Sequence, residues 1–160
     1  MFDIEQLNGF YRYCFCLTLD KSHAEDLLQT VLEKWLKLAN RQQYHSAYMR
    51  KMIRNQYIDD CRRQQCVAFD SIEQHAPVLL DEQNLEQLTV QQDLIEKVIV
   101  QLSVSEREVL YLWAVVGFSA TEIAAELAQP RGTVLSRLHR IKLKVAQWSA
   151  TTNEAWRQGS

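Results

Sequence analysis

The stretch from Leu102 to Trp148 constrains the fold most, because it carries the pattern of a helix-turn-helix. A serine followed three residues later by a glutamate, the signature of a capping box, opens each of two short helices, at Ser105–Glu108 and at Ser119–Glu122. Gly117 suits the position just past the end of the first helix. Apolar residues follow each cap at helical spacing: Val109, Leu110, Leu112, Trp113 and Val116, then Ile123 and Leu127.

A third helix is predicted after the break at residues 129–132. Pro130 ends the preceding helix and fits the first turn of the next, where no N–H is needed. One face of this helix is apolar and should be buried: Val134, Leu138, Ile141, Val145 and Trp148.

The opposite face of the third helix carries bases and hydroxyls with no acidic residue among them: Arg131, Thr133, Ser136, Arg137, Arg140 and Lys144. Such side chains can reach phosphates and base edges in a major groove. Because a two-helix platform precedes this face, we predict that it binds duplex DNA. An ordinary solvated helix face is the alternative interpretation.

Charge is distributed unevenly along the 160 residues, although the net charge is only −2. Six Lys and Arg against two Asp lie between residues 41 and 65, and five bases with no acid lie between 131 and 144. Seven acids against one lysine lie between 67 and 100. A polyanion is therefore expected to meet the two basic segments and not the acidic one between them.

The first half of the chain shows three further helical patterns. Aromatic residues at helical spacing predict a buried helix over residues 2–19. A capping box at Ser22–Glu25 is expected to open a second helix, which runs to about Ala39. One polar face of that helix carries Asp26, Gln29, Glu33 and Lys37. It is either a solvated face or a docking surface for basic helices of a partner.

The third pattern predicts a basic helix from Ser46 to about Gln65. Its inward residues should be Met49, Met52, Ile53, Tyr57 and Cys61, and its outward residues Arg50, Lys51, Arg54, Arg62 and Arg63. Tyrosines close to these bases (Tyr44, Tyr48 and Tyr57) suit single-stranded nucleic acid, since aromatic rings stack on unpaired bases.

These patterns predict an all-α protein with two small helical domains, at residues 1–66 and 85–160, joined by an acidic linker at 67–84 that contains Pro77. Helical spacing over residues 85–102 would make the second domain a four-helix unit. The polar tail from Ser149 is expected to fray. No segment shows the alternation of a strand.

Three segments together resemble the extracytoplasmic-function group of bacterial RNA polymerase sigma factors, within the sigma-70 family. Ala24-Glu-Asp-Leu-Leu-Gln29, followed by Trp35, resembles the family's helix for core polymerase. The segment from Tyr48 to Asp59, with Arg62-Arg63, resembles the one that opens the −10 element. Gly132-Thr-Val-Leu-Ser-Arg137-Leu-His-Arg140 resembles the helix that recognises the −35 element.

The resemblance implies a sigma factor that binds core RNA polymerase and directs transcription from particular promoters, often under an anti-sigma factor. It implies polymerase binding by Asp26, Gln29 and Glu33. It implies −35 contacts by the basic face described above, and no enzymatic activity or cofactor. The implied −10 contacts are Tyr48, Arg50, Lys51, Arg54, Asn55, Arg62 and Arg63. The family commonly has a glycine at the helix end where this chain has Ala128. If Ala128 keeps the left-handed conformation, the replacement should lower the stability of the fold by about 1 kcal/mol.

Two other functions compete with this one. A LuxR-type transcriptional regulator could carry a similar C-terminal domain, with Glu106-Arg-Glu-Val-Leu110 and Thr133-Val134. However, the first half shows no strand–helix alternation of a receiver domain. A thiol or metal enzyme would need the four cysteines and four histidines at ligand or nucleophile spacing, which they lack: Cys14, Cys16, Cys61, Cys66, His23, His45, His75 and His139.

Neither a metal site nor a small-molecule substrate is therefore expected, and the cysteines are expected to be reduced. No signal peptide and no apolar run of membrane length is present. The expected location is the cytoplasm, without membrane insertion.

Overall fold

The computed structural model describes residues 2–43, 45–64 and 99–158. The chain divides into two compact units, Met1–Ser71 and Ile72–Ser160. Throughout the described residues the regular structure is helical and includes no strand, which confirms the predicted all-α class. The predicted linker at 67–84, nearly all of the helix predicted over 85–102, Cys66 and His75 lie outside the described residues.

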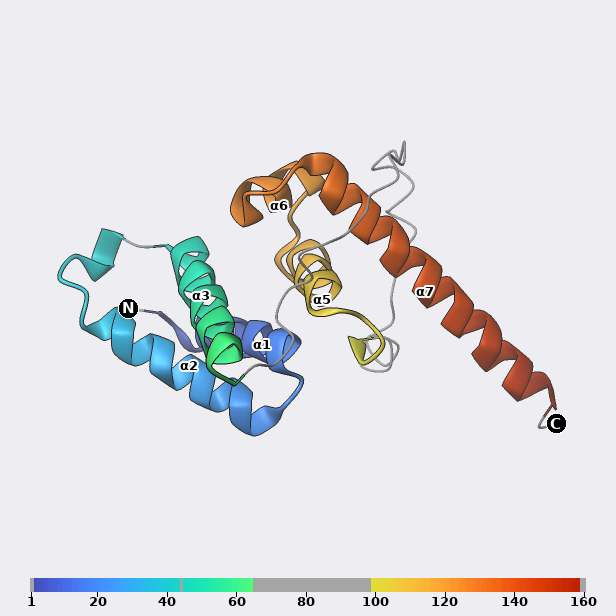
Figure 1. The fold of residues 1–160 in the computed structure, drawn as a ribbon, viewed down its shortest axis with the longest axis horizontal. Coiled ribbons are helices and arrows are strands. Elements are labelled where there is room, and N and C mark those ends of the chain that lie inside the picture. The colour runs from blue at the N-terminus through green and yellow to red at the C-terminus, as the bar shows by residue number, and fades with distance from the viewer. Residues whose placement is uncertain (1, 44, 65–98, 159–160) are drawn as a thin grey trace. The chain divides into compact units, whose positions relative to one another are not determined.

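The first unit is built from three α-helices that all pack on one another (Figure 1, blue to green). They are α1 (Ile4–Thr18), α2 (Lys21–Leu36) and α3 (Ser46–Gln64), with a short 3₁₀ helix, η1 (Arg41–Gln43), before α3. The three helices that the sequence predicts in this half are therefore present.

Aspartates begin the first two helices. The N–H of Gln6 donates to the Asp3 carboxylate at 2.7 Å, and the N–H of Asp3 donates to the Gln6 side chain at 3.1 Å, which completes a capping box. The Asp20 carboxylate accepts from the N–H of His23 at 2.9 Å and caps α2. The capping box predicted at Ser22 is wrong, because Leu19 adopts a left-handed conformation (φ 52°) that turns the chain at once into a helix capped by Asp20.

The core of the first unit lies where the three helices pack against one another. Trp35 lies at one end of this core. The centre of the Phe2 ring is 4.8 Å from the centre of the Trp35 ring and 4.9 Å from the centre of the Phe10 ring. Burying these side chains supplies the unit's main stabilisation. The apolar residues buried in this core are Phe10, Tyr13, Cys14, Cys16 and Leu17 of α1, Ala24, Leu27, Val31 and Trp35 of α2, and Met49, Ile53 and Cys61 of α3.

The second unit contains α5 (Val104–Tyr111), a single π-helical turn η3 (Leu112–Val116), α6 (Ala120–Leu127) and α7 (Arg131–Gln158) (Figure 1, yellow to red). Both α5 and α6 pack on α7. The two short helices, the turn and the third helix of the predicted helix-turn-helix are therefore present in the predicted order.

The helix ends in this unit match the sequence signals except at α5. The Ser119–Glu122 capping box is formed, with both of its hydrogen bonds at 3.2 Å. Gly117 ends η3 in a left-handed conformation (φ 84°). The box predicted at Ser105 is wrong, because Ser103 accepts from the N–H of Glu106 at 3.3 Å and Ser105 lies buried within the helix.

The long helix α7 buries the predicted apolar stripe most fully at its start. Val134, Leu138 and Ile141 are completely buried, whereas Val145 and Trp148 are only partly covered. The backbone is helical to Gln158, beyond Ser149, from where the tail is predicted to fray. No glycine or proline lies between these two positions to end the helix earlier.

Candidate functional site

The predicted docking face of α2 is exposed. Asp26, Gln29 and Glu33 all lie in solvent, and the Gln29 amide donates to the Glu33 carboxylate at 3.4 Å. The Thr30 hydroxyl donates to the backbone carbonyl of Asp26 at 2.8 Å, so it engages the helix backbone and leaves the Asp26 carboxylate available to a partner. The face presents two carboxylates and an amide at spacings of three and four residues.

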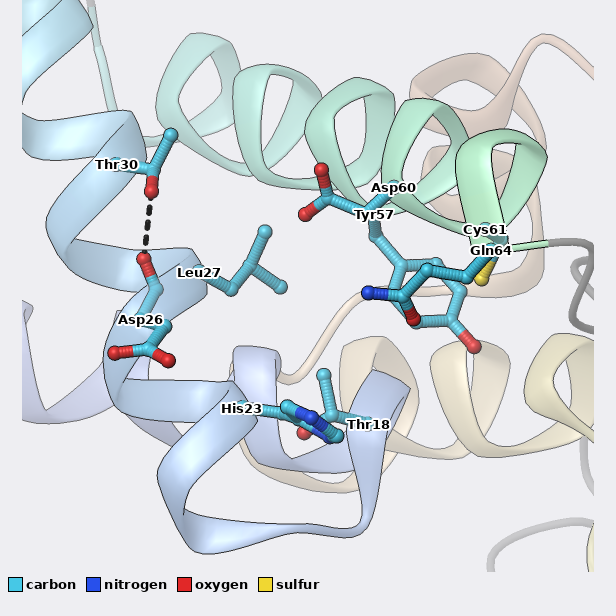
Figure 2. Close-up of a pocket in the computed structure, with 9 residues that line it drawn as sticks. All are labelled: Thr18, His23, Asp26, Leu27, Thr30, Tyr57, Asp60, Cys61 and Gln64. Atoms are coloured by element: carbon cyan, nitrogen blue, oxygen red, sulfur yellow. Dashed lines mark hydrogen bonds between the residues drawn. The ribbon is translucent and has the colours of Figure 1, made fainter.

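A cavity of about 440 Å³ lies beside this face, between the end of α1, the start of α2 and the end of α3. In Figure 2 Asp26 and Thr30 stand on one side of it, and Tyr57 and Asp60 on the other. The sequence did not predict this cavity, because its lining comes from three helices and only Asp26 belongs to the predicted site. The lining residues are Thr18, His23, Asp26, Leu27, Thr30, Tyr57, Asp60, Cys61 and Gln64.

The basic face of α3 is exposed at four of its seven predicted positions, namely Lys51, Asn55, Arg62 and Arg63. Tyr48 and Arg54 are partly covered. Arg62 lies 3.9 Å from the Asp59 carboxylate, and because both side chains are exposed this ion pair adds little stability.

Arg50 is the exception, since it is 8% exposed and the prediction that it points outward is wrong. Tyr57 and Cys61 follow it at seven and eleven residues, so all three fall on the same side of an α-helix. The long apolar stem of arginine tolerates such burial.

The loop before α3 borders a second, open hollow of about 510 Å³, lined by Leu38, Ala39, Asn40, Arg41, Gln42 and Gln43. Arg41 holds the loop to the end of α2, because its guanidinium donates to the Leu36 carbonyl at 2.9 Å and lies 5.9 Å from the centre of the Trp35 ring. The loop is thus anchored at the same aromatic cluster that closes the core.

The predicted DNA face of α7 is only partly open. Arg131 is exposed and donates to the Thr121 hydroxyl at 3.2 Å, while Thr133 and Arg140 are half-buried. Ser136 and Arg137 are buried, so the expectation that the whole face projects into solvent is wrong for them.

Local contacts explain the burial of these two residues. The Ser136 hydroxyl donates to the Gly132 carbonyl at 2.9 Å. Arg137 borders the apolar stripe of α7, and its guanidinium donates to the Gln129 side chain in the turn before the helix. Whether either side chain contacts DNA stays a prediction.

Lys144 has a partner within the unit. Its ammonium donates to both carboxylate oxygens of Glu106 at 2.8 Å, and the Glu106 side chain is only 6% exposed. The pair ties α7 to α5. The sequence could not indicate it, because the two residues are far apart in the chain and no local pattern links them.

The cysteines are buried thiols wherever the structure describes them. Cys14, Cys16 and Cys61 form no disulfide. Burial raises the pKa of Cys14 to about 12, so its thiol is protonated at neutral pH. Among the described residues, His, Cys, Asp and Glu gather nowhere in a group of three or more that could hold a metal ion. No described helix has both the length and the apolar content to cross a membrane.

Comparison with known proteins matches the two units to two regions of one family. The family model "Sigma-70 region 2" matches residues 5–66, and "Sigma-70, region 4" matches residues 92–145, so that together they match well over half of the chain. No curated protein matches the chain.

Among solved structures, the chain is similar to the sigma factor RpoE from Bartonella quintana, crystallised with the anti-sigma factor NepR. The identity is 22% and the TM-score 0.63, over 90% of this chain and 91% of that one. The shared fold agrees with the two family matches and their order along the chain. The chain therefore belongs to the sigma-70 family of RNA polymerase sigma factors.

Proposed function

We propose that the chain is an alternative sigma factor in which the first unit binds core RNA polymerase and the −10 element, and the second unit binds the −35 element. The observation that carries this proposal is the presence of region 2 and region 4 in one chain, in that order. The proposed boundaries are residues 1–66 for the first domain, 67–84 for the linker and 85–160 for the second domain.

Core polymerase is proposed to dock on α2 through Asp26, Gln29 and Glu33. These side chains are exposed, and they lie at spacings that put them on one face of the helix. Two carboxylates and an amide suit a partner surface that carries basic residues, since complementary charge speeds and orients association.

The −10 element is proposed to bind along α3. Lys51, Asn55, Arg62 and Arg63 are exposed and can reach phosphates or unpaired bases, with Tyr48 and Arg54 beside them. Arg50, being buried, is proposed to support this face from within the unit and not to bind DNA directly.

The −35 element is proposed to bind the first turns of α7. Arg131, Thr133 and Arg140 supply the accessible contacts, and Ser136 and Arg137 lie between them. Arg137 would exchange its contact with Gln129 for a base edge when DNA arrives. Lys144, held by Glu106, is proposed to fix the helix more than to touch DNA.

Control by an anti-sigma factor is proposed as well. The similar Bartonella quintana protein was crystallised with one, and that structure covers nearly the whole of this chain. As a transcription initiation factor, the protein would act together with polymerase in the cytoplasm and would catalyse no reaction of its own.

Binding to purified core polymerase in the absence of DNA tests this proposal. The chain is expected to co-elute with core polymerase and to bind duplex promoter DNA poorly by itself. A LuxR-type regulator would show the reverse pattern, and the region 2 match over residues 5–66 already speaks against that alternative. A chain that ignores core polymerase would contradict the proposal.

A further inference from the structure

Gln56 is a buried polar residue that none of the proposed contacts uses. It lies in the middle of α3, is 5% exposed, and belongs to neither the exposed basic face nor the apolar core. A buried amide is costly unless its oxygen and its nitrogen both find partners. The hydrogen-bond partners of the Gln56 oxygen and nitrogen therefore indicate why an amide is buried at this position.

Both ends of the Gln56 amide are engaged. Its oxygen accepts from the Lys34 ammonium, which comes from the last turn of α2. Its nitrogen donates to the Asp60 carboxylate, one turn further along α3, at 2.8 Å. Lys34, Gln56 and Asp60 thus form a chain of hydrogen bonds that runs from α2 into α3; we call it the Gln56 relay.

The Gln56 relay joins two helices with different proposed tasks. Lys34 follows directly after Glu33 of the proposed polymerase face. Gln56 follows directly after Asn55 of the proposed −10 face. The apolar contacts between α2 and α3 are non-directional, so a small shift of one helix along the other costs little free energy. A hydrogen bond, in contrast, fixes both a distance and an angle.

We propose that Gln56 is a positioning residue, whose relay to Lys34 and Asp60 sets the −10-binding helix relative to the polymerase-binding helix. This inference rests on the proposed function. Loss of the relay should leave α2 able to bind polymerase, because Asp26, Gln29 and Glu33 are untouched. It should impair promoter opening, because α3 then presents its side chains to the strand in a less defined position.

A paired substitution tests the relay. In Gln56→Glu the new carboxylate keeps the bond from Lys34 but loses the donor to Asp60 and repels its carboxylate. Asp60→Asn then supplies an amide that can donate to the new glutamate. We expect Gln56→Glu to lower the equilibrium yield of open complexes roughly tenfold, the effect of one lost charge-assisted hydrogen bond. The double variant should recover most of this yield, and Asp60→Asn alone should resemble the wild type.

The measurement uses holoenzyme reconstituted from the full chain and purified core polymerase, on a promoter that the wild type selects from a randomised library. Permanganate reactivity reports open complexes, and titration against labelled core polymerase reports binding. Affinity for core polymerase is expected to stay within about twofold of wild type in all variants, which corresponds to a change in binding free energy of under about half a kcal/mol. Thermal unfolding followed by circular dichroism checks that each variant is folded.

Lys34→Met provides a second route, because this exposed side chain can be changed without entering the core. It breaks the relay at its other end and should cause the same selective loss of open complexes. Lys21→Met removes an exposed lysine at the start of the same helix, outside both the Gln56 relay and the polar face of α2. It is the matched control and should behave as wild type.

Three results would overturn the inference: unchanged open complexes in Gln56→Glu and Lys34→Met, a parallel loss of core binding, or failure of Asp60→Asn to rescue Gln56→Glu. These differ from a failure of the proposed function itself. In that case the wild-type chain would neither bind core polymerase nor yield open complexes.

Discussion

Asp26 is the residue on which polymerase binding should depend most. It is exposed, its backbone carbonyl holds Thr30, and its carboxylate stands at the rim of the cavity between the three helices of the first unit (Figure 2). A partner that approaches α2 therefore meets this charge with little rearrangement of the chain. Charge reversal there tests the docking face directly.

Asp26→Lys should abolish binding to core polymerase while leaving helical content unchanged, because the substitution reverses a charge in solvent and removes no core contact. Fluorescence titration with labelled core polymerase measures the loss. Glu5→Lys, the same charge change at an exposed position of α1, serves as the control and should bind normally. Equal affinities for wild type and Asp26→Lys would refute the assigned face.

Burial of Cys14 should make the stability of the fold depend on pH. Its pKa lies at about 12 in the folded chain, against 9.0 for an exposed cysteine, because burial disfavours the thiolate. Below about pH 9 the thiol is protonated in both the folded and the unfolded state, and its contribution to stability is complete. Above that value the unfolded chain ionises first, so stability is lost as the pH rises toward about 12, by about 1.4 kcal/mol per pH unit.

The free energy of unfolding is measured in urea for wild type and for Cys14→Ala. The difference between the two proteins isolates the effect of Cys14 ionisation on stability. The stability advantage of the wild type should shrink by about 1 kcal/mol between about pH 8 and about pH 10. The cavity left by alanine lowers stability equally at both values and cancels in the comparison. Parallel pH profiles for the two proteins would show that Cys14 ionises equally in both states.

Arg50 and Arg137 show what sequence periodicity leaves open at the scale of single residues. The spacing correctly indicated that Asp26, Gln29 and Glu33 of α2 face solvent, because the apolar and the polar residues of this helix fall on separate faces. Arg50 and Arg137 instead border an apolar stripe, and an arginine at such a border can turn either way. Whether it is covered depends on neighbouring helices and on partners such as Gln129, which a local pattern does not specify.

At the scale of elements, the helix ends were predictable where only one cap fits. Ser119 has no competing cap nearby, and its capping box is as predicted. The segment Ser103-Val-Ser-Glu-Arg-Glu108 contains two overlapping serine–glutamate signatures, and the chain uses the earlier one. The Gln56 relay and the Glu106–Lys144 pair were not predictable either, since each joins helices that sequence spacing does not relate.

The end of α6 offers a stabilising substitution. Ala128 keeps the left-handed conformation (φ 52°) that a glycine would favour at this helix end, and a Cβ is strained there. Ala128→Gly should raise the free energy of unfolding by about 1 kcal/mol, as measured by urea denaturation. Ala125→Gly, three residues earlier within the same helix, should lower it by about the same amount. A loss of stability in Ala128→Gly would contradict the assigned conformation.

The start of α7 is where promoter specificity is expected. Arg137→Ala should cost roughly 1–3 kcal/mol of holoenzyme binding to DNA that carries the preferred −35 element, and much less on DNA with that element changed. Gln129→Met removes the partner of Arg137 within the chain but keeps the guanidinium, and should retain specificity. An equal loss on both DNAs would make Arg137 a phosphate contact, contrary to its assigned role in base recognition.

At the scale of the whole molecule, we propose that the two units have different tasks in transcription initiation. Each has its own helical core, and each matches a different region of the sigma-70 family. The first unit combines an acidic and amide face on α2 with a basic face on α3, so one small body can bind a protein and a nucleic acid together. In the second unit, two shorter helices, α5 and α6, pack on α7, which is the proposed recognition helix.

Transcription in vitro, with purified core polymerase over a randomised promoter library, tests this division of work most directly. We expect transcripts that depend on the added chain and start downstream of two shared sequence elements. Asp26→Lys should abolish all of them, while Arg137→Ala should relax only the upstream element. Absence of chain-dependent transcripts, or transcripts that share a single element, would contradict the account.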